Sequence, residues 1–162
     1  MVSTLILDTG VHMKKAIIVS ASTRIKKDPI EPIPALDRYD GIFFRVIKKY
    51  LREGRLENTD IIIVSEQLGV LLQNERIPYH KPIPGKWGPI VNKGKIEEKR
   101  RKNIARLNEI LKNYSTIYVN MGKGYLRLID GFDDLTEAKI VYATGKGIGP
   151  KALHMKKWIL SQ

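Results

Sequence analysis

Four short runs of apolar, mostly β-branched residues stand out along the chain, and each is followed by a turn. They cover residues 15–20, 60–65, 116–120 and 139–143, and the polar residues at their ends are Ser20, Ser65, Asn120 and Thr144. Continuous Ile/Val runs are typical of parallel strands that are buried on both faces. Because ligands of open parallel sheets collect at the carboxyl ends of the strands, the pattern predicts one crevice that gathers these polar ends.

Helical patterns alternate with the strands, at residues 37–53, 93–113 and in the final segment 144–160. In the first helix we expect Asp37 to cap the start, Phe43 to lie in the core and Phe44 to line a pocket. Residues 66–72 are expected to form a tight turn or a short helix. This alternation predicts an α/β fold, a three-layer domain with a mostly parallel sheet of four or five strands flanked by helices.

Length and composition fit one α/β domain over residues 1–162. Residues 1–12 are either an N-terminal extension before a natural start at Met13 or an additional strand. The absence of cysteine excludes disulfides, iron–sulfur clusters and thiolate zinc sites. No apolar run reaches 18 residues, so we expect no membrane span. The chain is rich in Ile, Lys, Glu and Arg and poor in Gln, which favours a heat-adapted archaeal or bacterial protein of the cytoplasm.

Positive charge makes nucleic acid, either tRNA or DNA, the expected partner. The 29 Lys and Arg residues stand against 17 Asp and Glu residues and give a net charge of +12. Basic domains attract polyanions because binding releases condensed counterions, although a soluble protein can also carry excess lysine. The second long helix adds a basic stripe, either a ridge that tracks phosphates or a solvated surface, made of Lys95, Lys99, Lys102 and Arg106.

Glycines cluster in the segment from Thr144 to Lys151, which follows a predicted strand and opens the last helix. Free amides at a helix start bind anions, so Gly147, Gly149 and Lys151 could form a phosphate-binding loop. The segment is also similar to a helix–hairpin–helix DNA element, although a strand precedes it here. A third interpretation is a turn that needs glycine torsion angles.

Acid–base candidates are His80, in the long proline-rich loop 73–92, and Asp37. The three histidines lack the spacing of metal ligands, so we expect no metal and no cofactor. Aromatic residues at loop edges, which suit base stacking, are Tyr39, Tyr79, Trp87 and Tyr125. Further candidate contacts to a ligand or nucleic acid are Ser20, Ser22, Arg24, Ser65, Gln67, Asn120 and Lys123.

Several segments, taken in order, match the pattern of a known family. They are Val19-Ser-Ala-Ser22, Arg38-Tyr-Asp-Gly-Ile-Phe-Phe44, Ile63-Val-Ser-Glu-Gln-Leu-Gly-Val-Leu-Leu72, Pro78-Tyr79 and Tyr118-Val-Asn-Met-Gly-Lys-Gly-Tyr125. Together they resemble the peroxide-stress YaaA-like superfamily over residues 15–158. The stretch Tyr79-His-Lys-Pro-Ile-Pro-Gly-Lys-Trp87 is also similar to an accessory domain of archaeosine synthase, a tRNA-modifying protein.

The resemblance implies a basic cleft and nucleic-acid binding, linked to oxidative stress or to tRNA modification, without a settled reaction. Two positions depart from the pattern: His80 replaces an arginine, and Gly147-Ile-Gly-Pro150 replaces an Arg-Gly motif. The residues that match are Ser20, Tyr39, Gly41, Ser65, Leu68, Gly69, Tyr79, Asn120 and Tyr125.

Three functions remain open at this point. The first is a nucleic-acid-binding protein of this superfamily, in which basic side chains contact phosphates and tyrosines stack on exposed bases. The second is an enzyme that acts on a nucleobase or nucleotide in the crevice, with Asp37 or His80 as general acid or base. The third is a small interaction partner whose basic surface docks an acidic protein.

Overall fold

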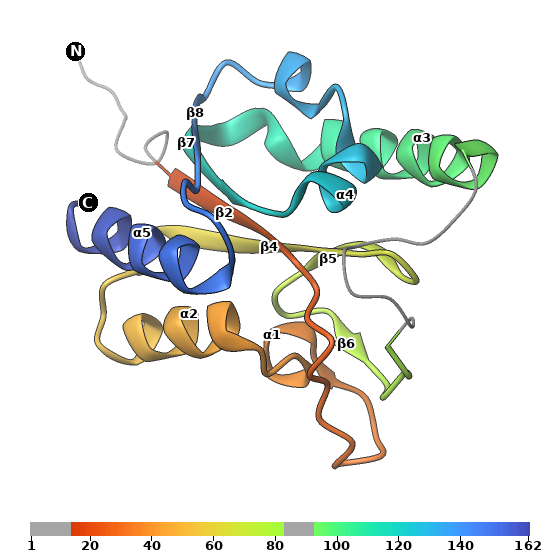
Figure 1. Ribbon diagram of the computed structural model, residues 1–162, viewed down its shortest axis with the longest axis horizontal. Helices are drawn as coiled ribbons and strands as arrows, with labels where there is room; N and C mark the ends of the chain where they lie inside the picture. The colour runs from red at the N-terminus through yellow and green to blue at the C-terminus, as the bar shows by residue number, and fades with distance from the viewer. Residues whose placement is uncertain (1–13, 83–92) are drawn as a thin grey trace.

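A five-stranded sheet forms the centre of the computed structural model, which describes residues 14–82 and 93–162 (Figure 1). The strand order is β5-β4-β2-β7-β8. The expectations for residues 1–12 and for Trp87 lie outside the described residues. The strands are β2 (Lys14–Ser20), β4 (Thr59–Ser65), β5 (Gly69–Leu72), β7 (Tyr114–Asn120) and β8 (Lys139–Tyr142).

Four of the strands are parallel, and only β5 runs against its neighbour. β2 lies between β4 and β7, and β8 pairs with β7. The α/β class and the mostly parallel sheet therefore agree with the prediction. The turn expected over residues 66–72 is confined to residues 66–68, and residues 69–72 form the strand β5 rather than a helix. Gly69 has a φ of +80° and opposes Ser65, so the chain reverses there and pairs antiparallel with β4. The hairpin buries Val70 and Leu71, which a solvated turn would leave exposed.

Helices cover both faces of the sheet (Figure 1). On one face, α2 (Ile42–Arg52) and α5 (Ile148–Leu160) pack on Ile17, Val19 and Ile63. On the other, α3 (Lys93–Ile110) packs on Ile18, Ile62 and Val64. The smaller elements are β3 (Ile33–Pro34), α1 (Ala35–Arg38), β6 (Arg76–Ile77), η2 (Leu111–Asn113), α4 (Lys123–Leu126), η3 (Arg127–Ile129) and η4 (Phe132–Leu135). Within the described ranges, no helix is long and apolar enough to cross a membrane.

The helix expected over residues 37–53 is interrupted between α1 and α2. The backbone around Tyr39 pairs with the loop after β2 instead, through Lys26 N to Arg38 O at 2.8 Å and Asp40 N to Arg24 O at 2.8 Å. Gly41 permits this close approach, because a Cβ there would lie 2.7 Å from the Ser22 Cβ. Asp37 consequently lies within α1 and is exposed, and it caps no helix.

The inner face of α2 is also shifted from the expected one. Phe44, Ile47 and Tyr50 are buried, whereas Phe43 is only partly buried. The assignment of Phe43 to the core and Phe44 to a pocket is therefore wrong. The apolar stripe of this helix is broad, and its centre depends on contacts that helical periodicity alone does not define.

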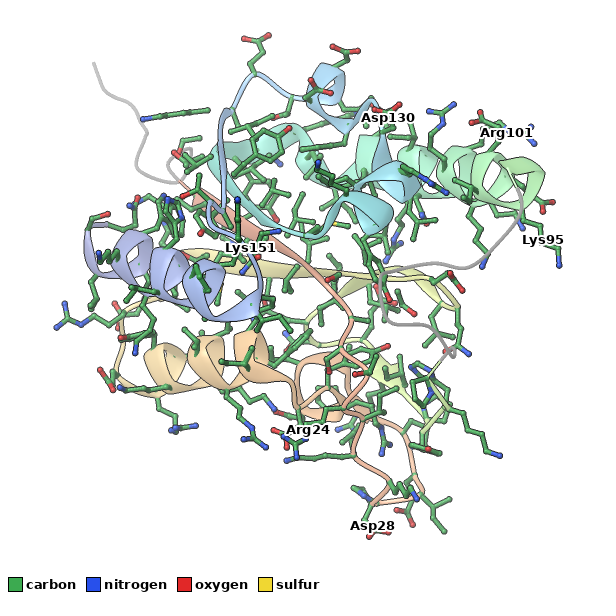
Figure 2. The ribbon with its side chains drawn as sticks, in the orientation of Figure 1. Arg24, Asp28, Lys95, Arg101, Asp130 and Lys151 are labelled. Carbon is green, nitrogen blue, oxygen red and sulfur yellow. The ribbon has the colours of Figure 1, made fainter. Side chains whose placement is uncertain are left out.

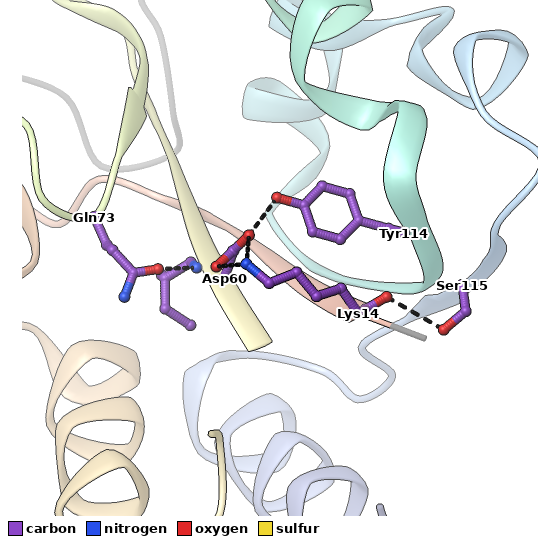
Figure 3. A network of polar contacts seen from close by, with 6 residues as sticks. Lys14, Asp60, Gln73, Tyr114 and Ser115 are labelled. Atoms are coloured by element: carbon purple, nitrogen blue, oxygen red, sulfur yellow. Dashed lines mark hydrogen bonds and ion pairs between the residues drawn. The ribbon is translucent and has the colours of Figure 1, made fainter. Parts of the chain in front are cut away.

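A polar network ties the amino ends of β2, β4 and β7 together (Figure 3). The Lys14 ammonium contacts the Asp60 carboxylate at 3.1 Å, and the Tyr114 hydroxyl donates to the same carboxylate at 2.7 Å. Partial burial and the adjacent Asp60 raise the pKa of Tyr114. One carboxylate thus joins three neighbouring strands at the edge of the sheet where these parallel strands begin, which we call the amino edge.

We expect Asp60→Ala to lower the free energy of unfolding by about 1–2 kcal/mol, because two partners lose their acceptor at a partly exposed position. Asp60→Asn should cost less, since its amide oxygen still accepts from Tyr114. Urea denaturation measures both changes, with Glu109→Ala on the exposed side of α3 as the control. Equal stability of Asp60→Ala and the wild type would show that the network does not stabilise the sheet.

Candidate functional site

The carboxyl ends of the parallel strands meet at one edge of the sheet, which we call the carboxyl edge. The register pairs Ser20 with Val64, and it pairs Val19 with Asn120. Val119 pairs with Tyr142, so Thr144 follows at the same edge. The four polar strand ends of the sequence, at Ser20, Ser65, Asn120 and Thr144, are therefore neighbours in the fold. The reversal of strand order around β2 places a topological switch point here, where open α/β sheets bind ligands.

A small pocket, the edge pocket, opens between the ends of β2 and β4. The loop after β2 supplies its first wall, the end of β4 its second, and His80 and Tyr125 close it. Asp37 does not line it, so the two expected acid–base residues are not brought together. Its lining is Ala21, Ser22, Thr23, Ile25, Ser65, Glu66, Gln67, His80, Pro82 and Tyr125.

His80 is held by partners on both ring nitrogens. Its Nε2 lies 2.8 Å from the Tyr39 hydroxyl, and its Nδ1 lies 2.5 Å from Gln67 Oε1. An amide oxygen only accepts, so Nδ1 carries the proton and Nε2 accepts from Tyr39 in the neutral ring. The structure thus fixes one tautomer and one orientation of His80 at the pocket wall, an arrangement suited to proton transfer.

Tyr39 is completely buried beneath this histidine. Burial raises the pKa of Tyr39 to about 12, and a hydrogen bond with Ser65 partly opposes the increase. The folded chain therefore favours the neutral phenol, which can donate to His80 throughout the neutral range.

The raised pKa of Tyr39 predicts a loss of stability at alkaline pH. Its stabilising contribution is fully present below the unfolded pKa of 10 and is lost as the pH rises through about 12. We expect the free energy of unfolding of the wild type to fall in this window. For Tyr39→Phe the slope of this free energy against pH should be smaller by the equivalent of about one bound proton. Urea denaturation across the window measures both slopes, and identical slopes would contradict the assignment.

Two buried polar side chains at the carboxyl edge retain unsatisfied acceptors. Glu66 is 6% exposed, and neither of its carboxylate oxygens has a hydrogen-bond partner. Asn120 is fully buried; its amide nitrogen lies 3.6 Å from the Met155 sulfur, and its oxygen has no partner. Buried polar groups are normally satisfied, so this edge differs from an ordinary core. Sequence reasoning selected Asn120 and placed residues 65–67 in the crevice, but it assigned no role to Glu66, whose signal is a charged residue directly after a buried strand.

Exposed cations surround the carboxyl edge, and we call them the edge cations. In the described ranges, none of them has a carboxylate oxygen within 4 Å. Figure 2 shows two of them, Arg24 and Lys151, on different elements. They come from the loops after β2 and β8, from the residue after His80, from the first residue of α4 and from the first turn of α5. They are Arg24, Lys26, Lys27, Lys81, Lys123, Lys146 and Lys151, of which Lys151 is only partly exposed.

The basic stripe on α3 is partly engaged in packing. Lys99 lies 3.7 Å from the Glu66 carboxylate, and Arg106 pairs with Glu75 at 2.5 Å. The first contact docks α3 on the turn between β4 and β5 and the second on the turn between β5 and β6, so these two residues do not form a free ridge. Lys102 is exposed and lines a cavity beside them, and Lys95 lies near the start of the helix (Figure 2).

Torsion angles explain part of the glycine cluster before α5. Gly145 and Gly147 have φ values of +126° and +88°, and a Cβ on Gly145 would lie 2.6 Å from the Pro150 side chain. Gly149 has no such requirement and is exposed. The phosphate-binding interpretation of this loop stays a prediction.

The remaining expected residues surround the pocket at different depths. Tyr125 and Ser22 line it and are partly exposed, and Tyr79 is partly exposed without lining it. Ser20 also lies beside the pocket lining, at the end of β2. Among the described residues, no group of three His, Asp or Glu side chains could hold a metal ion.

Comparisons with known proteins give a structural neighbour only. No family model and no curated protein sequence match the chain. A similar solved structure is that of AF0587, a protein of unknown function, with a TM-score of 0.49 and 14% sequence identity. The match covers 93% of this chain and 46% of AF0587, so the chain spans about half the length of that protein.

Proposed function

We propose that this chain binds nucleic acid at the carboxyl edge. The observation that carries the proposal is the set of edge cations, which lie on separate loops and helix starts around the strand ends and have no acidic partner among the described residues. Unpaired surface lysines and arginines contact phosphates, and each contact releases a counterion. Net charge alone identifies no surface, whereas the position of these cations does.

Single-stranded segments, in RNA or DNA, suit this edge better than duplex. The edge pocket has a volume of only about 30 Å³, but its lining offers an aromatic ring in Tyr125 and hydroxyl groups in Ser22 and Thr23. Unpaired bases stack on aromatic rings and form hydrogen bonds through their edges, while the bases of a duplex are already stacked and paired with one another. The resemblance to the YaaA-like superfamily supports a role in tRNA modification or oxidative stress, in the cytoplasm of a heat-adapted organism.

Salt dependence of binding tests this proposal. We expect single-stranded RNA or DNA to bind at low salt and the affinity to fall with a log–log slope of about −2 or steeper, which corresponds to about three phosphate contacts. Fluorescence anisotropy with labelled oligonucleotides and with a matched duplex measures the slopes. Undetectable binding of tRNA, single strands and duplex at low salt contradicts the proposal, and a pull-down that retains only an acidic protein after nuclease treatment would favour the docking alternative.

An enzyme that acts on a base or nucleotide is the second candidate, and the orientation of His80, held by hydrogen bonds at both ring nitrogens, favours it. His80→Gln should then abolish turnover while the affinity for nucleic acid stays within about twofold. Asp37→Asn serves as a matched control, because Asp37 is exposed and does not line the pocket. Turnover that survives His80→Gln would remove this candidate.

A further inference from the structure

Glu66 stands between the edge pocket and a second cavity, which we call the α3 cavity. The α3 cavity has a volume of about 380 Å³ and lies between α3 and the β4–β5 hairpin. Glu66 lines both spaces, although its side chain is only 4% exposed. Three cations, Lys99, Lys102 and Arg106, line the α3 cavity with it, as does a second carboxylate, Glu98. This volume lies in the range of small-molecule sites.

The unsatisfied carboxylate of Glu66 indicates which hydrogen-bond donors a ligand of the α3 cavity would supply. Both oxygens lack hydrogen-bond donors, and leaving a buried charged acceptor unpaired is costly. Lys99 Nζ, at 3.7 Å, balances the charge but lies beyond the distance of a charge-assisted hydrogen bond. Because the charge is already balanced, the missing partners are neutral N–H groups rather than a metal ion or an ammonium group.

Among the nucleobases, guanine matches this requirement. Its N1–H and N2–H groups lie side by side on one edge and can donate to the two oxygens of one carboxylate. Adenine and cytosine place a ring nitrogen acceptor beside the amino group, and uracil places carbonyls beside its single N–H, so each of them directs a lone pair at the carboxylate.

The surroundings of Glu66 also fit the rest of a nucleotide. Leu68, 41% exposed, and Val70 give the α3 cavity an apolar wall for a flat base. Lys102, exposed on α3 with no carboxylate within 4 Å in the described ranges, is available for a phosphate. An anion is favourable in a chain of net charge +12.

We propose that the α3 cavity binds a guanine nucleotide, with the Glu66 carboxylate accepting from N1–H and N2–H of the base and Lys102 contacting the phosphate. The proposal rests on the proposed function only for the source of the base, which is either a free nucleotide or an unpaired guanosine within a nucleic acid.

Guanosine and inosine monophosphate form the sharpest pair of probes, because they differ only by the N2 amino group. Calorimetric titration should show guanosine monophosphate binding about tenfold or more tightly than inosine or adenosine monophosphate. Glu66→Gln should reduce the affinity for guanosine monophosphate about tenfold and change the other two by less than about twofold. Glu109→Gln, an exposed glutamate on α3 that does not line the α3 cavity, is the matched control and should change none of them.

Equal affinities for the three nucleotides, or an unchanged preference in Glu66→Gln, would overturn the guanine site. A merely structural Glu66–Lys99 pair instead predicts that Glu66→Gln lowers the melting temperature without changing any nucleotide preference. The same titration with oligonucleotides that contain one guanosine or one inosine separates the two sources. Oligonucleotide binding without a guanine preference would leave the proposed function standing alone, and nucleotide binding without oligonucleotide binding would leave only the guanine site.

Discussion

Replacing Arg38 by alanine is expected to lower the free energy of unfolding by about 3 kcal/mol or more. Arg38 is fully buried, and no carboxylate within the described residues lies within 4 Å of it. Its guanidinium donates instead to backbone carbonyls of the loop after β2 and of β6. The acceptors are Lys26, Pro29, Glu31 and Ile77, at 2.8–3.3 Å.

The physical reason is that one buried planar group donates to four backbone carbonyls, of which Ile77 O is buried and the other three are partly buried. Alanine would leave them without donors, and lysine has a single nitrogen that cannot reproduce the fork geometry, so Arg38→Lys should also destabilise. Arg38→Ala would release the loop that carries Arg24 and Lys26, so we expect Arg38→Ala also to weaken nucleic-acid binding.

Urea denaturation and limited proteolysis measure the effect of Arg38→Ala. We expect faster cleavage within residues 24–34, a loop that Figure 2 shows projecting from the fold around Asp28. Arg45→Ala is the control, because Arg45 forms an exposed pair with Asp40 at 3.2 Å and should cost less than about 1 kcal/mol. Arg38→Ala with the stability and the cleavage rate of the wild type would refute this role.

Reversing three edge cations is expected to weaken binding of single-stranded nucleic acid about a hundredfold or more at low salt. The variant Arg24→Glu/Lys81→Glu/Lys123→Glu removes three proposed phosphate contacts and adds repulsion at the same places. The log–log salt slope should also become shallower by about two. These side chains are exposed and form no ion pair within the described residues, so the melting temperature should stay close to that of the wild type.

A matched variant separates position from net charge. Lys112→Glu/Lys139→Glu/Lys157→Glu makes the same change of charge at exposed residues before β7, at the start of β8 and in the last turn of α5. The contact between Lys15 Nζ and Gln162 Oε1, at 3.0 Å, places the end of α5 at the amino edge. This variant should lose only a small part of the affinity. Equal losses in both variants would show that binding is non-specific.

The strands of the parallel sheet were predictable because each is a buried run. Val19 and Ile63 lie in strands that deviate from the predicted bounds by at most one residue, since double burial demands continuous apolar sequence. The convergence of the polar strand ends followed from the parallel arrangement. The same logic explains why Ser65 of the candidate site was found from the sequence, whereas His80 was selected as a titratable residue in the long loop 73–92.

Other features depended on contacts between distant segments. The break at Tyr39 arises from pairing with the loop after β2, and helix propensity contains no signal for it. The strand β5 forms because Gly69 reverses the chain, while its four residues are too short for a clear alternation. The burial of Arg38 was not predicted, because arginine is seldom fully buried without an acidic partner.

Glu66 illustrates the limit at the candidate site. A charged residue after a strand is most often exposed, and only its burial between α3 and the hairpin leaves its oxygens without donors. Its partner Lys99 belongs to a helical stripe for which the sequence left open a solvated surface or a phosphate-tracking ridge. Spacing along one helix could not show that Lys99 reaches a carboxylate in the turn after β4.

Lysine footprinting in the presence of saturating single-stranded nucleic acid tests the central claim most directly. Acetylation rates of individual lysines, read by mass spectrometry, should fall about fivefold or more at Lys81, Lys123 and Lys151, where phosphates would cover the amino groups. Rates at Lys112, Lys139 and Lys157 should not change. Protection of this second set, or no protection at the carboxyl edge while nucleic acid is bound, would contradict the account.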